Sequence, residues 1–204
     1  VIGFGAGEPD FPTPSHVIEE VKIASENPAY HKYTAVGGLP ILRDEISRTT
    51  KKYSNFEIDP DNVVVTNGGK QAILTTFMSL LDPGDEVLIP SPYWTTYPEA
   101  VKISGGEPVI VNTDFENDFK VTVEQLEEKF TEKTKVLVWV SPSNPTGVVY
   151  SKEEAEEIYN WAFDKNIWIL SDELYEHLVY EGVTSPSPAT IDKNLEKTIV
   201  VNGV

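Results

Sequence analysis

The apolar positions of this chain change their spacing along the sequence. Residues 1–36 are irregular and rich in Gly and Pro, but helical spacing of apolar residues predicts helices over 15–26 and 39–53. From residue 61, short β-branched runs alternate with amphipathic stretches. The runs predict strands over 63–65, 86–90, 108–112, 136–140, 167–171 and 198–202. The stretches predict helices over 69–81, 97–104, 123–130 and 152–165.

This alternation predicts an α/β fold. Strands that are apolar almost throughout, separated by helices, are typical of a mostly parallel sheet sandwiched by helices. Ligands of such domains bind at the carboxyl ends of the strands. We assign residues 37–204 to the α/β domain and residues 1–36 to a separate N-terminal segment.

Composition narrows the function classes. The formal net charge of -17 argues against binding to nucleic acid or to an anionic membrane surface. The chain has no cysteine, and its three histidines show no metal-ligand spacing, so we predict no metal site. No apolar run approaches the roughly 18 residues that a membrane helix needs.

Four motifs follow predicted strands, where ligands are expected. They are Asn-Gly-Gly-Lys-Gln-Ala at 67–72, Ser-Pro-Tyr-Trp at 91–94, Ser-Pro-Ser-Asn-Pro-Thr-Gly at 141–147 and Ser-Asp-Glu-Leu-Tyr at 171–175. The first is suited to phosphate, because glycines expose backbone N–H groups at a helix N-terminus. It is no nucleotide P-loop, since Val64 and Gln71 replace the required Gly and Ser/Thr. Taken singly, each motif also has a structural reading as a turn, a packed aromatic residue or a helix cap.

Together with Gly-Glu-Pro-Asp-Phe at 7–11, these motifs resemble class I aminotransferases of fold type I. The resemblance covers essentially the whole chain and is strongest to the bacterial and archaeal aspartate aminotransferase branch. It implies that residues 37–204 form the large domain that binds pyridoxal 5′-phosphate (PLP). Residues 1–36 would then supply the N-terminal arm and a piece of the small domain.

The resemblance also implies roles for individual residues. Asp172 would pair with the pyridinium nitrogen of PLP, and Asn144 and Tyr175 would hydrogen-bond its phenolic oxygen. Trp94 would stack on the ring, and both Trp94 and Asn144 would contact the substrate. Gly69, Lys70 and Gln71 would bind the 5′-phosphate of PLP. Tyr33 would reach the phosphate bound by the neighbouring subunit, and Gly7 would contact the substrate carboxylate. The role of Tyr33 implies a homodimer with shared active sites.

Two parts of the family pattern are missing. The lysine that forms a Schiff base with PLP normally follows an Asn-Gly-x segment, which here occupies 202–204. The arginine that binds the substrate α-carboxylate belongs to the family's C-terminal half, whereas Arg43 and Arg48 lie on one early helix. We therefore interpret the chain as an N-terminal half, and expect these 204 residues alone to be inactive.

The implied function is transfer of an amino group from an amino acid, by default aspartate, to a 2-oxo acid in the cytoplasm. Two alternatives remain open. One is another fold type I PLP enzyme, such as a β-eliminating lyase, and the other is a non-catalytic PLP-binding module. The sequence does not decide which amino-acid side chain is preferred.

Overall fold

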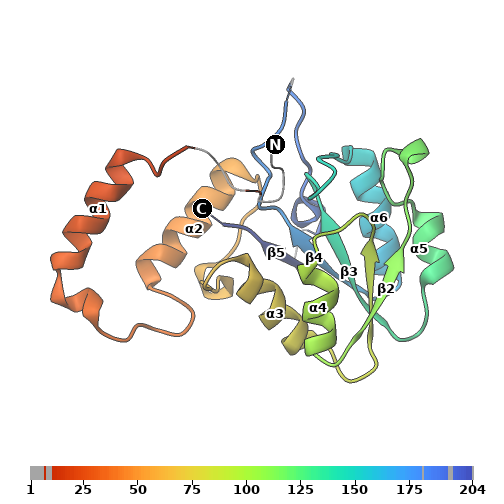
Figure 1. Cartoon of the computed structure of the whole chain (residues 1–204), viewed down its shortest axis with the longest axis horizontal. Helices are drawn as coiled ribbons and strands as arrows, with labels where there is room; N and C mark the ends of the chain where they lie inside the picture. The colour runs from red at the N-terminus through yellow and green to blue at the C-terminus, as the bar shows by residue number, and fades with distance from the viewer. Residues whose placement is uncertain (1–6, 8–10, 181, 193–194, 204) are drawn as a thin grey trace, which may run out of the picture.

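The computed structural model describes residues 7, 11–180, 182–192 and 195–203. Helices and strands alternate as the sequence predicts from residue 69 onward (Figure 1). The helices are α1 (Ser15–Glu26), α2 (Pro40–Tyr53), α3 (Gly69–Leu80), α4 (Thr96–Ile103), α5 (Val123–Lys129) and α6 (Lys152–Asp164). The strands are β1 (Glu86–Pro90), β2 (Glu107–Val111), β3 (Thr134–Val140), β4 (Trp168–Asp172) and β5 (Thr198–Val201).

The strands form one parallel sheet in the order β2-β1-β3-β4-β5. The chain runs outward from β1 to β2 and then returns to the other side of β1 with β3. This reversal makes the β1/β3 junction a topological switch point, where open α/β sheets bind ligands. The predicted α/β fold class is thus confirmed.

Two apolar cores cover the two faces of the sheet, because successive strand residues point to opposite sides. Leu88, Leu137 and Ile169 pack with α5 and α6 on one face. Val87, Val136 and Leu170 pack with α3 and α4 on the other. The same alternation of side-chain directions continues to the end of β4. Asp172, two residues after Leu170, therefore faces the α3/α4 side.

Capping residues determine where two of the helices begin. Thr122 and Gln125 form a capping box at α5, and Ser151 and Glu154 form another at α6. In each box, a side-chain oxygen accepts a hydrogen bond from an N–H group that the helix leaves unpaired. These local signals explain why both starts were predictable from sequence.

The N-terminal helices lie apart from the sheet (Figure 1). None of the residues in α1 or α2 is buried in this chain. The end of α2 is nevertheless tied to the α/β domain, since Ser54 Oγ donates a 3.2 Å hydrogen bond to Glu176. The proposed boundary between an N-terminal segment and the α/β domain remains a prediction.

One predicted strand is wrong. Val63 is extended, but residues 63–65 join no strand of the described sheet, and Val64 is 65% exposed. The N–H of Val65 donates to the carbonyl of Gly37, in the loop that precedes α2. A β-branched run favours extended backbone, but a strand also needs a neighbouring strand to supply its hydrogen bonds.

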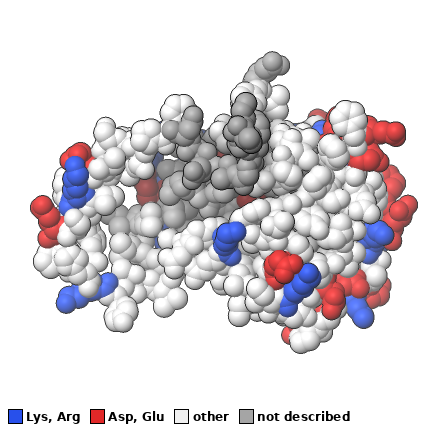
Figure 2. Space-filling view, viewed as in Figure 1, with Lys and Arg blue, Asp and Glu red and all other residues white. Residues whose placement is uncertain are grey.

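Acidic side chains gather at the end of the molecule that carries α5, whereas the centre of the same face holds few charges (Figure 2). The sequences of α5 and α6 account for much of this, with Glu-rich exposed positions. On this face, the negative charge is therefore concentrated at one end. Among the described residues, no helix combines the length and apolar character needed to cross a membrane.

Candidate active site at the carboxyl ends of the strands

Three of the predicted site motifs meet at one edge of the sheet. Tyr93 and Trp94 follow β1, Asn144 follows β3, and Asp172 is the last residue of β4. They converge because all these strands are parallel and therefore end on the same side. The cavity at the β1/β3 junction is lined by Tyr93 and Asn144 and measures only about 20 Å³, room for about one water. A larger ligand would lie over the strand ends.

Asp172 is a buried carboxylate with a specific partner. It is 7% exposed, and its Oδ2 accepts a 2.7 Å hydrogen bond from the hydroxyl of Tyr97, which is 1% exposed. Its Oδ1 accepts a 3.3 Å bond from the N–H of Leu174. Burial raises the pKa of Asp172, and these two hydrogen bonds oppose the rise. A cationic partner would therefore stabilise the ionised carboxylate.

Tyr97 was missed by the sequence analysis, although a signal for it existed. It lies on the inner face of α4 with Ala100 and Val101, one turn further along the helix. A tyrosine on a buried stripe needs a hydrogen-bond partner. Burial and then the charge of Asp172 raise the pKa of Tyr97, so its hydroxyl keeps its proton and acts as a donor.

The N-terminus of α3 presents a group of backbone donors. Gly68 has φ +78°, a left-handed conformation that glycine adopts without strain, and α3 begins at Gly69. Among the described residues, the N–H groups of Gly69, Lys70 and Gln71 have no hydrogen-bond acceptor, as expected for a first helical turn. The Gln71 side chain is turned back to the loop, where it accepts from the N–H of Asn67 at 2.6 Å.

Contacts connect this helix N-terminus to Asp172. Lys70 Nζ lies 4.2 Å from the ring centroid of Trp94 and donates a 3.0 Å hydrogen bond to Thr96. Trp94 in turn meets Tyr97 edge-on, with 5.8 Å between ring centroids. The phosphate-type motif, the aromatic motif and the carboxylate thus form one continuous site.

Glu173 is a second buried carboxyl group at the end of β4. It is 3% exposed, and its Oε1 accepts 2.6 Å hydrogen bonds from Ser171 and Ser187. Burial, and then the charges of Glu176 and Asp172, raise its pKa to about 7 against the lowering effect of the two hydroxyls. Glu173 belongs to the 171–175 motif, but its sequence context assigns it no role of its own.

The other predicted residues are placed differently. Tyr175 is half-buried and close enough to Tyr97 to contribute to its raised pKa, after burial and Asp172. Tyr33 is fully exposed, so this chain does not bring it into its own site. Gly7 is exposed with open space around it, and the rest of its motif up to residue 10 lies outside the described residues.

The fold and the site together define a class of protein. The chain belongs to the aminotransferase class I and II family, whose model matches residues 1–204. The resemblance drawn from the strand-end motifs is therefore confirmed.

Individual relatives narrow the comparison. The chain is 55% identical to an aspartate aminotransferase of Streptomyces avermitilis, a match that covers 100% of this chain and 50% of that protein. An aspartate aminotransferase of Bacillus subtilis is 47% identical, with 100% and 52% covered. The chain spans about half the length of the curated relatives it matches.

Solved structures show the same relationship. An aromatic aminotransferase from Pyrococcus horikoshii superposes with a TM-score of 0.96 at 40% identity, covering 100% of this chain and 54% of that one. The aspartate aminotransferase of Thermus thermophilus with maleate has a TM-score of 0.91 at 42% identity, with 98% and 51% covered.

Proposed function

We propose that the full-length protein is a PLP-dependent aminotransferase that moves the amino group of an amino acid to a 2-oxo acid. The observation that carries the proposal is the buried Asp172–Tyr97 pair, which is connected through Trp94 and Lys70 to the N-terminus of α3. Family membership supports it, and relatives named aspartate aminotransferase support aspartate as the first donor to test.

The residues present fit PLP as a cofactor. The N-terminus of α3 would hold its phosphate with backbone N–H groups and a favourable helix dipole. Asp172 would face the ring nitrogen, Asn144 and Tyr175 the phenolic oxygen, and Trp94 the ring. When bound, PLP supplies an electron sink for negative charge that develops at the substrate α-carbon.

Asp172 would keep a proton on the ring nitrogen. Its burial makes an isolated negative charge costly, so an adjacent N–H cation would stabilise the carboxylate and be stabilised in return. Tyr97 holds one oxygen of the carboxylate in place, since its own ring is buried on α4. The Asp172–Tyr97 pair would therefore orient the PLP ring and keep a proton on its ring nitrogen.

The remaining parts belong to the same proposal. A lysine beyond residue 204 would bind PLP covalently and move the substrate proton, and an arginine in the C-terminal half would bind the α-carboxylate. The exposed Tyr33 of one subunit would reach the phosphate bound by the other, in a cytoplasmic homodimer.

The test uses the full-length protein. We expect PLP to bind and aspartate with 2-oxoglutarate to react, and Asp172→Ala to lower kcat on the order of 10²–10³-fold. Asp164→Ala, at an exposed position ending α6, is the matched control. Near-normal turnover by Asp172→Ala would contradict the proposal. Release of pyruvate and ammonia from an amino acid alone would instead favour a lyase.

Borohydride reduction of the PLP complex, followed by mass mapping, tests the assignment of the lysine. We expect the adduct on a lysine shortly beyond residue 204. An adduct on Lys70 would show that the phosphate site is wrongly assigned, and the absence of a specific adduct would favour a non-catalytic module.

A further inference from the structure

The ladder between β3 and β4 ends at Asp172, beside the other residues on which the site depends. Its last register pair is Val140 with Asp172. The residues that follow are Ser141 and Glu173, both buried. Asn144 lies three residues beyond Ser141, so the positions of Asn144 and Asp172 depend on how these two strand ends are held together.

A segment distant in sequence bridges the two ends. The hydroxyls of Ser185 and Ser141 are 2.9 Å apart, and the hydroxyl of Ser187 donates a 2.6 Å hydrogen bond to Glu173. Residues two apart in an extended segment point to the same side, which lets both serines face the strand ends. Pro186 between them favours extended backbone at Ser185.

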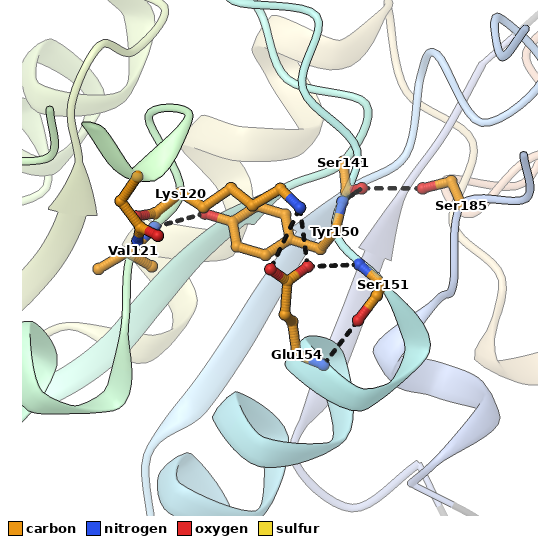
Figure 3. Close-up of polar contacts among 8 residues, drawn as sticks. Lys120, Val121, Ser141, Tyr150, Ser151, Glu154 and Ser185 are labelled. Atoms are coloured by element: carbon orange, nitrogen blue, oxygen red, sulfur yellow. Dashed lines mark hydrogen bonds and ion pairs between the residues drawn. The ribbon is translucent and has the colours of Figure 1, made fainter. Parts of the chain in front are cut away.

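The Ser141 end of the bridge is fixed by further hydrogen bonds (Figure 3). Ser141 Oγ accepts from the N–H of Tyr150 at 3.3 Å, and the Tyr150 hydroxyl accepts from the N–H of Val121 at 2.9 Å. Beside this contact, Lys120 pairs with Glu154 at the start of α6. Ser185 is thus linked to a network of contacts that reaches the first turn of α6.

The Glu173 end is fixed in the same way. The N–H of Glu173 donates to the carbonyl of Val201 on β5 at 2.9 Å, and its carboxyl also accepts from Ser171. Ser187 Oγ accepts from the N–H of Ala189 and so caps the short helix Pro188–Thr190. The hydroxyl of each serine therefore has a partner that other hydrogen bonds also hold in place.

We propose that Ser185 and Ser187 form a brace that positions Asn144 and Asp172 for the cofactor. The inference rests on the proposed function, because it assigns the brace a role toward bound PLP. Both serines are positioning residues: each acts through the strand end that it holds. Without one serine hydroxyl, its strand end loses one of the hydrogen bonds that hold it, while the sheet and the two cores still hold the fold.

The first test measures PLP affinity in the full-length protein. Loss of one neutral hydrogen bond corresponds to about a fivefold change, so Ser185→Ala and Ser187→Ala should each raise the PLP dissociation constant about fivefold. Ser185→Thr, which keeps the hydroxyl, should restore wild-type affinity. The control is Ser79→Ala, an exposed serine whose hydroxyl donates to the Thr75 carbonyl within α3. Unchanged affinity in both alanine variants overturns the proposal.

A double-mutant cycle separates positioning from a general loss of stability. If Ser187 acts through Asp172, the affinity loss caused by Ser187→Ala should largely disappear in an Asp172→Asn background. An equal loss in both backgrounds overturns the proposal. If Ser187→Ala does not fold, Ser185→Ala combined with Asn144→Ala gives the same test.

A measurement that needs no cofactor can test the brace separately from the proposed function. If the wild-type protein binds no PLP, the proposed function fails. Amide hydrogen exchange then tests whether Ser185 and Ser187 hold the two strand ends. We then expect faster exchange at Tyr150 in Ser185→Ala and at Glu173 in Ser187→Ala, with no change in Ser79→Ala. Unchanged exchange at both amides overturns the brace itself.

Discussion

The hydroxyl of Tyr97 donates a 2.7 Å hydrogen bond to Asp172, a residue 75 positions further along the chain. The two side chains come from α4 and from the end of β4, and both are buried. A hydrogen bond to a charged group is worth about 1.5–3 kcal/mol, so Tyr97 is a main determinant of whether Asp172 is ionised.

Replacing Tyr97 with Phe should change the pH dependence of PLP binding. The hydrogen bond from Tyr97 lowers the pKa of Asp172, so its removal lets that pKa rise. The proposed site needs an ionised Asp172. On acidification, PLP binding to the full-length apoprotein should therefore begin to weaken at a higher pH in Tyr97→Phe than in wild type. Tyr180→Phe, at an exposed position, is the control. An unchanged midpoint would disprove this role.

Replacing Glu173 with Gln should flatten the pH dependence of stability. Burial raises the pKa of Glu173 from 4.5 to about 7, so the native state binds more protons than the unfolded state between these values. The free energy of unfolding then falls as the pH rises through this window, by up to about 3 kcal/mol. Urea unfolding at pH 5 and pH 7.5 measures it. The same slope in Glu173→Gln would contradict the assignment.

Asp192 should stabilise the turn that leads into β5. Its carboxylate accepts hydrogen bonds from the N–H groups of Glu196 and Lys197 and from the Thr198 hydroxyl. Burial raises its pKa, but the hydrogen bonds outweigh this and the net pKa is lowered. Asp192→Ala should therefore lower the free energy of unfolding by about 2 kcal/mol at pH 7.

The pH dependence of this effect has the opposite sign to that of Glu173. A lowered folded-state pKa contributes stability at pH values above the unfolded value of 3.8, and that contribution is lost as the pH falls through the folded value. The gap between wild type and Asp192→Ala should therefore narrow on acidification. A constant gap for Asp192→Ala would rule out the ionic role.

Mixing two inactive variants tests the shared site. Tyr33→Ala and Asp172→Ala should each have low activity alone. In a mixed dimer, the site of the Tyr33→Ala subunit keeps its own Asp172 and receives Tyr33 from the other subunit. Random exchange should therefore restore about a quarter of wild-type activity. No recovery, with mixed dimers shown by mass spectrometry, would mean that Tyr33 serves no neighbouring site.

Most of the secondary structure was predictable because its signals are local. The strand at Glu86–Pro90 and the helix at Ser15–Glu26 were predicted with the bounds observed, and the other helices and the sheet strands to within two residues. Residues 63–65 carry an equally strong local signal, yet form no strand. Strand formation depends on a partner that lies elsewhere in the sequence.

The candidate site was less predictable from the sequence than the secondary structure. The strand-end motifs singled out Gly69, Lys70, Trp94 and Asp172, and a continuous series of contacts connects these residues in the structure. Their roles toward a cofactor remain predictions. The partner of Asp172 was missed, because nothing in the sequence pairs α4 with the end of β4. For Tyr33, the exposed side chain leaves the predicted role untested.

The sequence by itself determined the α/β class, the helix starts and the family, because periodicity, capping residues and motif order are all properties of neighbouring positions. Only the tertiary structure decided that Tyr97 bonds Asp172, that Glu173 is buried with a raised pKa, and that Ser185 and Ser187 bridge two strand ends. These relationships depend on burial and on distances between remote segments. Both arise only when the parallel sheet brings the strand ends to one edge.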